Sequence, residues 1–136
     1  MIGENHMKKV LALLAIVGVL FVAGCSSSSS AVQTVDPQTF VQTATQPGVT
    51  VIDVRTPAEY AASHVGGAIN IDVEAPTFAD EINKLDKNGT YAVYCHSGRR
   101  SGIATDQMGQ AGFTKVYNLK GGIADLQAAG APIVAS

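Results

Sequence analysis

The strongest chemical signal in this sequence is a cysteine that lies between an apolar run and a short basic loop. Residues 91–94 are apolar and β-prone, and Cys95 follows them directly. A helical pattern begins a few residues later, so the thiol faces the N-terminus of a helix. Such surroundings lower the pKa of a thiol and attract anions. The stretch therefore predicts a reactive thiolate at Cys95.

The loop after this cysteine has the residue types that an anion-binding site needs. Its consecutive backbone N–H groups can bind a thiolate or the oxyanion of a bound molecule. Gly98 lets the backbone curl without a Cβ penalty, and either arginine can supply positive charge. We expect Ser101 to cap the following helix. The predicted anion-binding residues are His96, Ser97, Gly98, Arg99, Arg100 and Ser101.

The sequence leaves alternatives open for His96 and for Cys95. His96 adjoins the predicted nucleophile and can tune it electrostatically, but side chains that are adjacent in sequence usually diverge. The predicted chemistry requires no metal and no organic cofactor, and the sequence contains no cluster of metal-ligating residues. The alternative to a reactive thiol is a buried, inert cysteine that only fills space.

The elements that position this loop alternate between strand and helix patterns. Strands are expected at residues 32–35, 49–54, 68–71, 91–94 and 115–119. Helices are expected from Asp36-Pro37 onward and at residues 58–63, 77–85, 101–110 and 123–129, with a turn at residues 64–67. This alternation predicts an α/β fold, with an open parallel sheet and helices on both faces.

Two charged residues lie where a predicted strand gives way to a loop, at the sheet edge where such folds place their sites. We interpret Asp53 and Arg55 as supporting residues: Asp53 braces the reactive loop, and Arg55 pairs with Glu59. Direct contact with a substrate is the alternative. His64 precedes a Gly-Gly pair, and we expect it to hold that turn by hydrogen bonds rather than to titrate during catalysis.

The N-terminal residues are typical of export rather than of a folded core. Residues 1–6 have the character of a vector remnant, and residues 7–24 that of a signal peptide, with two lysines before an apolar run. That run is shorter than the roughly 20 residues of a membrane-spanning helix. Residues 25–31 form a Ser-rich tether, and residues 32–136 form the expected single domain.

The end of the apolar run resembles the processing site of bacterial lipoproteins. The residues are Val22-Ala23-Gly24-Cys25. The resemblance implies a lipid on Cys25 and a domain on the periplasmic side of a bacterial membrane, and Ser26 favours the outer membrane. An uncleaved N-terminal anchor is the alternative.

The cysteine count and the net charge narrow the chemistry further. With a lipid on Cys25, Cys95 would be the one free thiol, and no internal disulfide could form. The formal net charge of −2 gives no sign of nucleic-acid binding.

Three separated stretches resemble the single-domain members of the rhodanese family, in this order and over residues 32–133. They are Val51-Ile52-Asp53-Val54-Arg55 with Glu59-Tyr60 and residues 64–71, Val93-Tyr94-Cys95 with its loop to Ser101, and residues 112–123. The resemblance implies a five-stranded, mainly parallel sheet wrapped by helices. One departure is Leu126, which stands where family members often have tryptophan.

The resemblance also implies an activity, that of a sulfurtransferase. Cys95 would accept a sulfane sulfur from a small anionic donor such as thiosulfate and become a persulfide. It would then pass the sulfur to a thiol, to a cyanide-like acceptor or to a protein. A persulfide carrier or partner-binding module with little small-molecule turnover is the main alternative. A redox thiol that forms a sulfenic acid or a mixed disulfide is another.

A phosphatase is the enzymatic rival that the loop length argues against. Phosphatases and arsenate reductases of related fold place five residues between the cysteine and an arginine. In this chain Ser101 occupies that position and Arg100 comes one residue earlier. The shorter loop suits a sulfur atom better than a tetrahedral phosphate.

Overall fold

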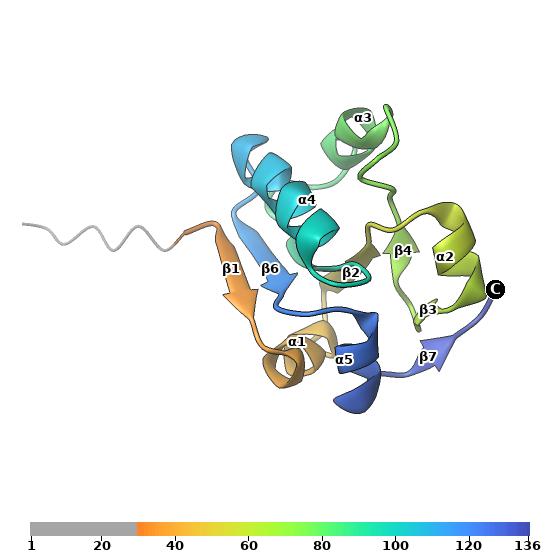
Figure 1. The fold of residues 1–136 in the computed structure, drawn as a ribbon. Helices are drawn as coiled ribbons and strands as arrows, with labels where there is room; N and C mark the ends of the chain where they lie inside the picture. The colour runs from red at the N-terminus through yellow and green to blue at the C-terminus, as the bar shows by residue number, and fades with distance from the viewer. Residues whose placement is uncertain (1–29) are drawn as a thin grey trace, which may run out of the picture.

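A five-stranded sheet lies at the centre of the computed structural model, which describes residues 30–136. The elements are β1 (Val32–Val35), α1 (Pro37–Ala44), β2 (Val49–Asp53), α2 (Pro57–Ala62), β3 (His64–Val65), β4 (Ile69–Asn70), α3 (Phe78–Asn83), β5 (Thr90–Tyr94), α4 (Arg99–Gln110), β6 (Lys115–Leu119), α5 (Ile123–Ala128) and β7 (Ile133–Val134). The strand order is β1-β6-β5-β2-β4, and every neighbouring pair is parallel (Figure 1). The predicted α/β class and parallel sheet are therefore confirmed.

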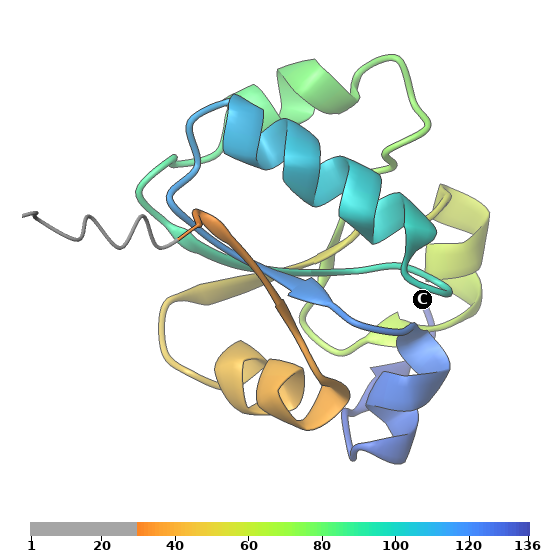
Figure 2. The same cartoon turned by 60° about the vertical axis from the view of Figure 1, so that its left-hand side comes forward.

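Helices cover both faces of this sheet, as predicted (Figure 2). Helices α3 and α4 lie on one face, and α1 and α5 lie on the other. The central strand β5 contributes alternate side chains to the two cores, so that Val93 packs under α4 while Tyr94 packs toward α1. Both cores are closed by fully buried apolar side chains, among them Ile52, Val93, Met108, Phe40 and Leu126. Burial on both faces makes β5 a rigid support for the residue that follows it, Cys95.

Local signals in the sequence explain where the first two helices begin. Asp36 caps α1, because its carboxylate accepts a hydrogen bond from the Thr39 N–H at 2.8 Å. Thr56 caps α2 in a capping box, in which Thr56 and Glu59 bond to each other's backbone N–H groups. A proline occupies the first turn of each helix. These starts were predicted from the sequence and are confirmed.

Residues 64–67 correct one prediction, because they do not form a simple turn. His64 and Val65 form the short strand β3, which pairs antiparallel with β7 near the C-terminus. The C-terminal residues thus return to the α2–β3 region, where the Ser136 N–H also bonds to the Ala61 carbonyl at 3.1 Å. A strand of two residues is too short to show an alternation pattern, and its partner lies about seventy residues away in sequence. No local signal therefore predicts this pairing.

The helix after the reactive loop also begins earlier than predicted. We expected a helix from residue 101 with Ser101 as its cap, whereas α4 begins at Arg99 and its N-cap is Gly98. The strand expected at 49–54 ends one residue earlier, at Asp53, and the short strand expected at 68–71 covers only Ile69–Asn70. The helix expected at 77–85 is likewise shorter, Phe78–Asn83.

A buried polar network joins β2 and β5 beside the end of the sheet. The Asp53 carboxylate accepts hydrogen bonds from the Arg55 guanidinium at 2.6 Å and from the Tyr94 hydroxyl at 2.7 Å. The same hydroxyl accepts the Val65 N–H at 2.9 Å, and the Asn70 amide donates to the carbonyls of both Asp53 and Arg55. Every charge in this network has a partner, which is the condition under which burial of charges is tolerated.

The predictions for the N-terminal residues lie outside the described part of the chain. These are the vector remnant at 1–6, the signal peptide at 7–24, the lipid on Cys25 and most of the tether. Within residues 30–136, no helix has the length and hydropathy that crossing a membrane requires.

The Asp53 network makes a prediction for stability. Asp53→Ala leaves the buried Arg55 guanidinium without its counter-charge, so we expect the free energy of unfolding to fall by about 3–5 kcal/mol. Urea denaturation followed by circular dichroism measures this loss. Asp106→Asn, at an exposed position of α4, is the control, and its effect should stay within about 0.5 kcal/mol. Equal losses in the two variants would contradict the account of the network.

Candidate active site

The sulfur of Cys95 lies at the end of β5, inside the loop that leads to α4. The residue is 1% exposed, so the thiol is buried. Its Sγ accepts a hydrogen bond from the Gly98 N–H at 3.0 Å, and the Ser101 hydroxyl lies 3.5 Å away. The loop therefore wraps around one sulfur atom, as the sequence pattern predicted.

Two opposing effects act on the pKa of this thiol. Burial raises it, because a thiolate loses hydration in the interior. Hydrogen bonds from the Ser101 hydroxyl and from the backbone N–H groups of Ser101, Gly98 and Ser97 lower it. The hydrogen bonds prevail, and the pKa of Cys95 is lower than that of an ordinary cysteine. A lowered pKa increases the thiolate fraction at neutral pH, and the thiolate is the nucleophile.

The turn from loop to helix depends on Gly98, which has a φ of 107°. This left-handed conformation favours glycine, and here it directs the Gly98 N–H at the sulfur. Ser101 is not a cap, which corrects the sequence prediction. It lies in the first turn of α4, fully buried, and its hydroxyl oxygen lies 3.1 Å from the Gly98 carbonyl oxygen and 3.5 Å from Sγ, so that its one proton can be donated to either. The serine thus faces both the helix start and the sulfur.

The two arginines of the loop have different surroundings. The Arg100 guanidinium forms two hydrogen bonds to the Glu59 carboxylate of α2, at 2.7 and 2.8 Å. These bonds lower the pKa of Glu59 to about 2 and raise that of Arg100, so the pair stays ionised across the physiological range. Arg99 is exposed, and no carboxylate within residues 30–136 lies at salt-bridge distance from it.

This pairing corrects the predicted partner of Glu59. We expected Arg55 to bind Glu59, but Arg55 turns inward to Asp53 and to the Ser63 carbonyl. Arg55 precedes α2 and is not on the helix, so the spacing of four residues does not place it beside Glu59. Glu59 was expected to pair with Arg55, and its contact with the loop through Arg100 was not expected. Its position three residues after Thr56 marked it as a helix cap but gave no sign of its second partner.

The Gly121-Gly122 turn before α5 packs directly against the loop. A Cβ atom built on Gly122 would lie 1.6 Å from the His96 carbonyl oxygen, so only glycine fits at that position. The Ile123 N–H, at the start of α5, donates to the Cys95 carbonyl at 3.1 Å. This Gly-Gly pair was not predicted to belong to the site, and it packs directly against the backbone of the loop.

The remaining predicted residues lie near the loop without touching the sulfur. Asp53 and Arg55 are buried, and Asp53 reaches the site only through Tyr94, which directly precedes Cys95. His96 is exposed and points away from the core, whereas Cys95 is buried, so these neighbouring side chains diverge. His64 bonds through Nδ1 to the Tyr60 carbonyl at 2.8 Å and stacks on the Tyr60 ring. This hydrogen bond ties His64 to α2 and not to the Gly66-Gly67 turn that it was expected to hold.

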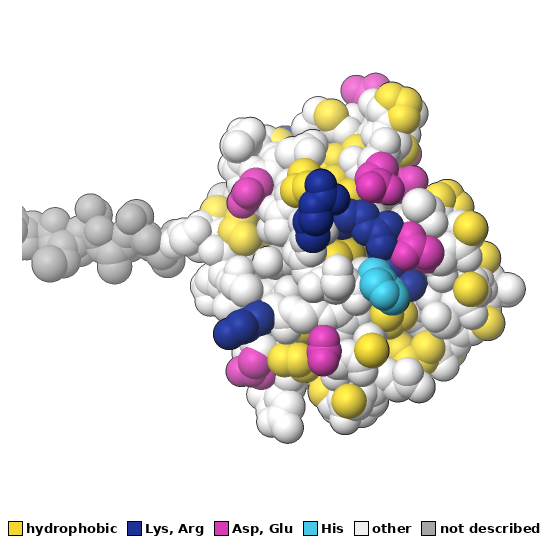
Figure 3. All heavy atoms as spheres, in the orientation of Figure 1, with side chains coloured by type: hydrophobic (Ala, Val, Ile, Leu, Met, Phe, Trp, Pro, Cys, Tyr) yellow, Lys and Arg dark blue, Asp and Glu magenta, His cyan; other side chains and the backbone are white. Residues whose placement is uncertain are grey.

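The surface around the loop mixes basic and acidic groups. Figure 3 shows Lys and Arg side chains beside a histidine, with acidic side chains along one side of them. The exposed positions of the loop are His96, Ser97 and Arg99. Within residues 30–136, no group of three or more His, Cys, Asp or Glu side chains is arranged to hold a metal ion.

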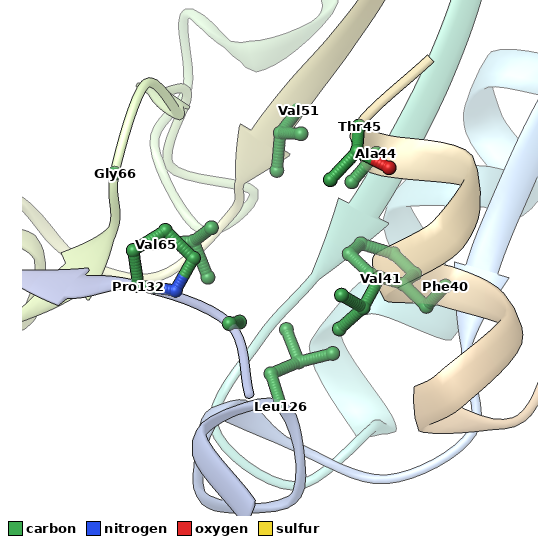
Figure 4. A pocket seen from close by; sticks show the side chains of 10 residues that line it. Phe40, Val41, Ala44, Thr45, Val51, Val65, Gly66, Leu126 and Pro132 are labelled. Atoms are coloured by element: carbon green, nitrogen blue, oxygen red, sulfur yellow. The ribbon is translucent and has the colours of Figure 1, made fainter. Parts of the chain in front are cut away.

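An apolar cavity of about 80 Å³ lies on the opposite side of the sheet, between α1 and α5 (Figure 4). It contains no titratable or nucleophilic side chain, and its only polar side chain is that of Thr45. Leu126, which replaces the expected tryptophan, lines this cavity. Cys95 belongs to the other core, so the cavity is not part of the candidate site.

The fold and the site define a class of domain in which a parallel α/β sheet holds a buried cysteine inside a loop of N–H donors. Such a loop stabilises a thiolate. The family profile of the rhodanese-like domain matches residues 36–129, and the chain belongs to this family. The resemblance seen in the sequence is thereby confirmed.

Named relatives agree with this assignment. The chain is 43% identical over 75 residues to the thiosulfate sulfurtransferase PspE of Escherichia coli, an alignment that covers 55% of this chain and 71% of PspE. It is 32% identical to YrkF of Bacillus subtilis, which is named as a candidate sulfur carrier, over 74% of this chain and 54% of that protein. A solved structure described as rhodanese with anions from E. coli superposes with a TM-score of 0.53 at 39% identity, over 65% of this chain and 99% of that one.

The lowered pKa of Cys95 predicts a pH profile for its alkylation. In the unmodified protein, the iodoacetamide rate should reach half its maximum at a pH below about 8.5, the value for free cysteine. Ser101→Ala removes a hydrogen bond that lowers the pKa, so its midpoint should move to higher pH and its rate at neutral pH should fall. The rate is followed by mass spectrometry of the Cys95 peptide. Coincident profiles would contradict the role given to Ser101.

The close approach of Gly122 predicts a second effect on the thiol. In Gly122→Ala the new methyl group displaces the His96 carbonyl, so the N–H groups no longer converge on the sulfur. We expect a folded protein whose Cys95 alkylation midpoint lies at higher pH than that of the unmodified protein, because burial still raises the pKa when the hydrogen bonds are lost. Gly67→Ala serves as the control, because no heavy atom surrounds its Cβ position although its φ of 82° adds strain. A normal profile in Gly122→Ala would overturn this account.

Proposed function

We propose that this protein is a sulfurtransferase that moves a sulfane sulfur from a small anionic donor, such as thiosulfate, to a thiophilic acceptor through a persulfide on Cys95. The observation that carries the proposal is the buried Sγ, which accepts the Gly98 N–H and has a lowered pKa. Sulfur transfer needs a stable thiolate and then a stable terminal persulfide anion. One ring of N–H donors serves both species.

The reaction divides into two displacements that balance without a redox partner. In the first, the Cys95 thiolate attacks the sulfane sulfur of thiosulfate. A new S–S bond forms, the S–S bond of the donor breaks, and sulfite leaves with the bonding electron pair. In the second, an acceptor such as cyanide attacks the outer sulfur, and thiocyanate leaves while the thiolate is regenerated. No proton has to move in either step when both nucleophiles are anions.

The shape of the site favours this chemistry over phosphate hydrolysis. Cys95 is only 1% exposed, which favours a slender group such as a terminal sulfur atom over a bulkier tetrahedral phosphate. Arg100 is engaged with Glu59, which leaves it fewer free donors for an equatorial phosphate oxygen. The names of the relatives, a thiosulfate sulfurtransferase and a rhodanese solved with anions, support the same reaction class.

A second candidate function is that of a dedicated sulfur carrier. The similarity to YrkF favours it, although this chain covers only 54% of that protein. A carrier would form the same persulfide but would pass its outer sulfur to one protein partner and turn over small donors poorly.

We further propose, from the N-terminal residues, that the domain is attached by a lipid on Cys25 to the periplasmic side of a bacterial membrane. The membrane would then be a partner through that lipid alone.

Thiocyanate formation from thiosulfate and cyanide tests the proposed activity. We expect multiple turnovers by the unmodified chain and a loss of at least about a thousandfold in Cys95→Ser. Cys25→Ser is the matched control and should turn over normally, because Cys25 has no part in the chemistry. Rates for the unmodified chain no higher than those of Cys95→Ser would refute the enzyme. A single burst of thiocyanate without turnover would favour the carrier.

A further inference from the structure

One ion pair at the edge of the site neutralises half of the positive charge that the loop carries. The two terminal nitrogens of the Arg100 guanidinium, Nη1 and Nη2, donate hydrogen bonds to the two carboxylate oxygens of Glu59, at 2.7 and 2.8 Å. The pair is partly buried, with 17% of the Arg100 side chain and 33% of the Glu59 side chain exposed. Bidentate geometry of this kind holds a guanidinium in one orientation.

Glu59 is held in place from its own side as well. Its Oε2 accepts the Thr56 N–H at 3.2 Å and the Thr56 hydroxyl at 3.0 Å, which fixes the carboxylate at the first turn of α2. Helix α2 lies beside the start of α4 (Figure 2), and Glu59 on α2 is a fixed acceptor for Arg100. The Arg100 guanidinium cannot turn toward a donor without breaking two charge-assisted hydrogen bonds.

The charge that an incoming donor meets follows from this arrangement. Arg99 is exposed and, within residues 30–136, has no carboxylate at salt-bridge distance. The thiolate and the Arg99 side chain then contribute opposite charges, and the Glu59–Arg100 pair contributes none. A dianionic donor therefore meets a site without excess positive charge, and the thiolate repels it. A monoanionic donor is repelled less, because it carries one negative charge fewer.

We propose that Glu59 is a specificity-determining residue, which limits the attraction of the site for dianionic sulfur donors by holding Arg100 in an ion pair. The inference rests on the proposed sulfur transfer and names the donors that the site prefers: those that carry one negative charge beside the sulfane sulfur. Such donors include organic thiosulfonates. Glu59 acts through Arg100 and touches no reacting atom.

The test compares two donors that differ by one charge. Thiosulfate is a dianion, and methanethiosulfonate replaces one of its oxygens by a methyl group and is a monoanion. Each transfers its sulfane sulfur to a thiolate, with sulfite or methanesulfinate as the leaving group. The quantity measured is the ratio of kcat/KM for thiosulfate to kcat/KM for methanethiosulfonate, with cyanide as acceptor and at low ionic strength.

Glu59→Gln is the informative variant, because glutamine keeps the capping hydrogen bonds and the size of the side chain but loses the charge. A unit charge acting over roughly 8 Å through a solvent-rich site changes the binding of one further charge by about twofold to sixfold. We therefore expect the ratio to rise by about that factor in Glu59→Gln, through a lower KM for thiosulfate, and to return toward that of the unmodified chain in salt.

Glu74→Gln is the matched control. Glu74 is exposed and acts on Arg100 only through space, without a hydrogen bond to it. Its ratio should rise by less than that of Glu59→Gln, because Glu74 does not hold the Arg100 guanidinium by hydrogen bonds. An unchanged ratio in Glu59→Gln overturns the proposal, and so does an equal loss of activity with both donors, which would make Glu59 a purely structural residue.

Alkylation of Cys95 gives a readout that does not depend on sulfur transfer. Iodoacetate and iodoacetamide attack by the same displacement but differ by one charge. The ratio of their rates at the Cys95 peptide should rise in Glu59→Gln by a similar factor and should rise less in Glu74→Gln. A rise in this ratio without thiocyanate formation by the unmodified chain would refute the sulfurtransferase and leave the charge effect standing. An unchanged ratio would refute the charge effect itself.

Discussion

The convergence of backbone N–H groups on the Cys95 sulfur is the interaction on which the rest of this structure depends. A buried thiolate is costly, and only hydrogen bonds from the loop make its pKa lower than that of an ordinary cysteine. Residues 96–98 of the loop lie in no strand or helix, so their shape comes from their neighbours. Strand β5 fixes its first residue, helix α4 its last, and the Gly121-Gly122 turn packs beneath it.

The polar groups around the loop fall into two sets with different tasks. Asp53, Arg55 and Tyr94 form a buried network in which burial and the bond to Asp53 raise the pKa of the Tyr94 hydroxyl, which therefore stays neutral. This set joins the strands and keeps the residue before Cys95 in place. Glu59 and Arg100 form a partly buried pair that joins α2 to the loop. The first set determines where the sulfur lies, and the second determines which charges an approaching donor meets.

Much of this arrangement could be predicted from the sequence, because local signals carried it. The alternation of strands and helices predicted the sheet, and a cysteine at the end of an apolar strand predicted the place of the thiol. The partner of Glu59 could not be predicted, since Arg55 and Arg100 are both arginines and only the fold decides which one turns inward. The pairing of β3 with β7 depends on residues far apart in sequence. The Gly-Gly pair before α5 was a usable signal for a close approach, although it does not name the loop that it contacts.

The most direct test of the account is the mass of the Cys95 peptide after the full chain has been exposed to thiosulfate and then to cyanide. The account predicts a gain of about 32 Da, one sulfur atom, on this peptide and its complete loss when cyanide is added. The peptide that contains Cys25 should not change. A Cys95 peptide of unaltered mass, with thiosulfate in excess and the thiol free, would contradict the central claim that this loop stabilises a persulfide.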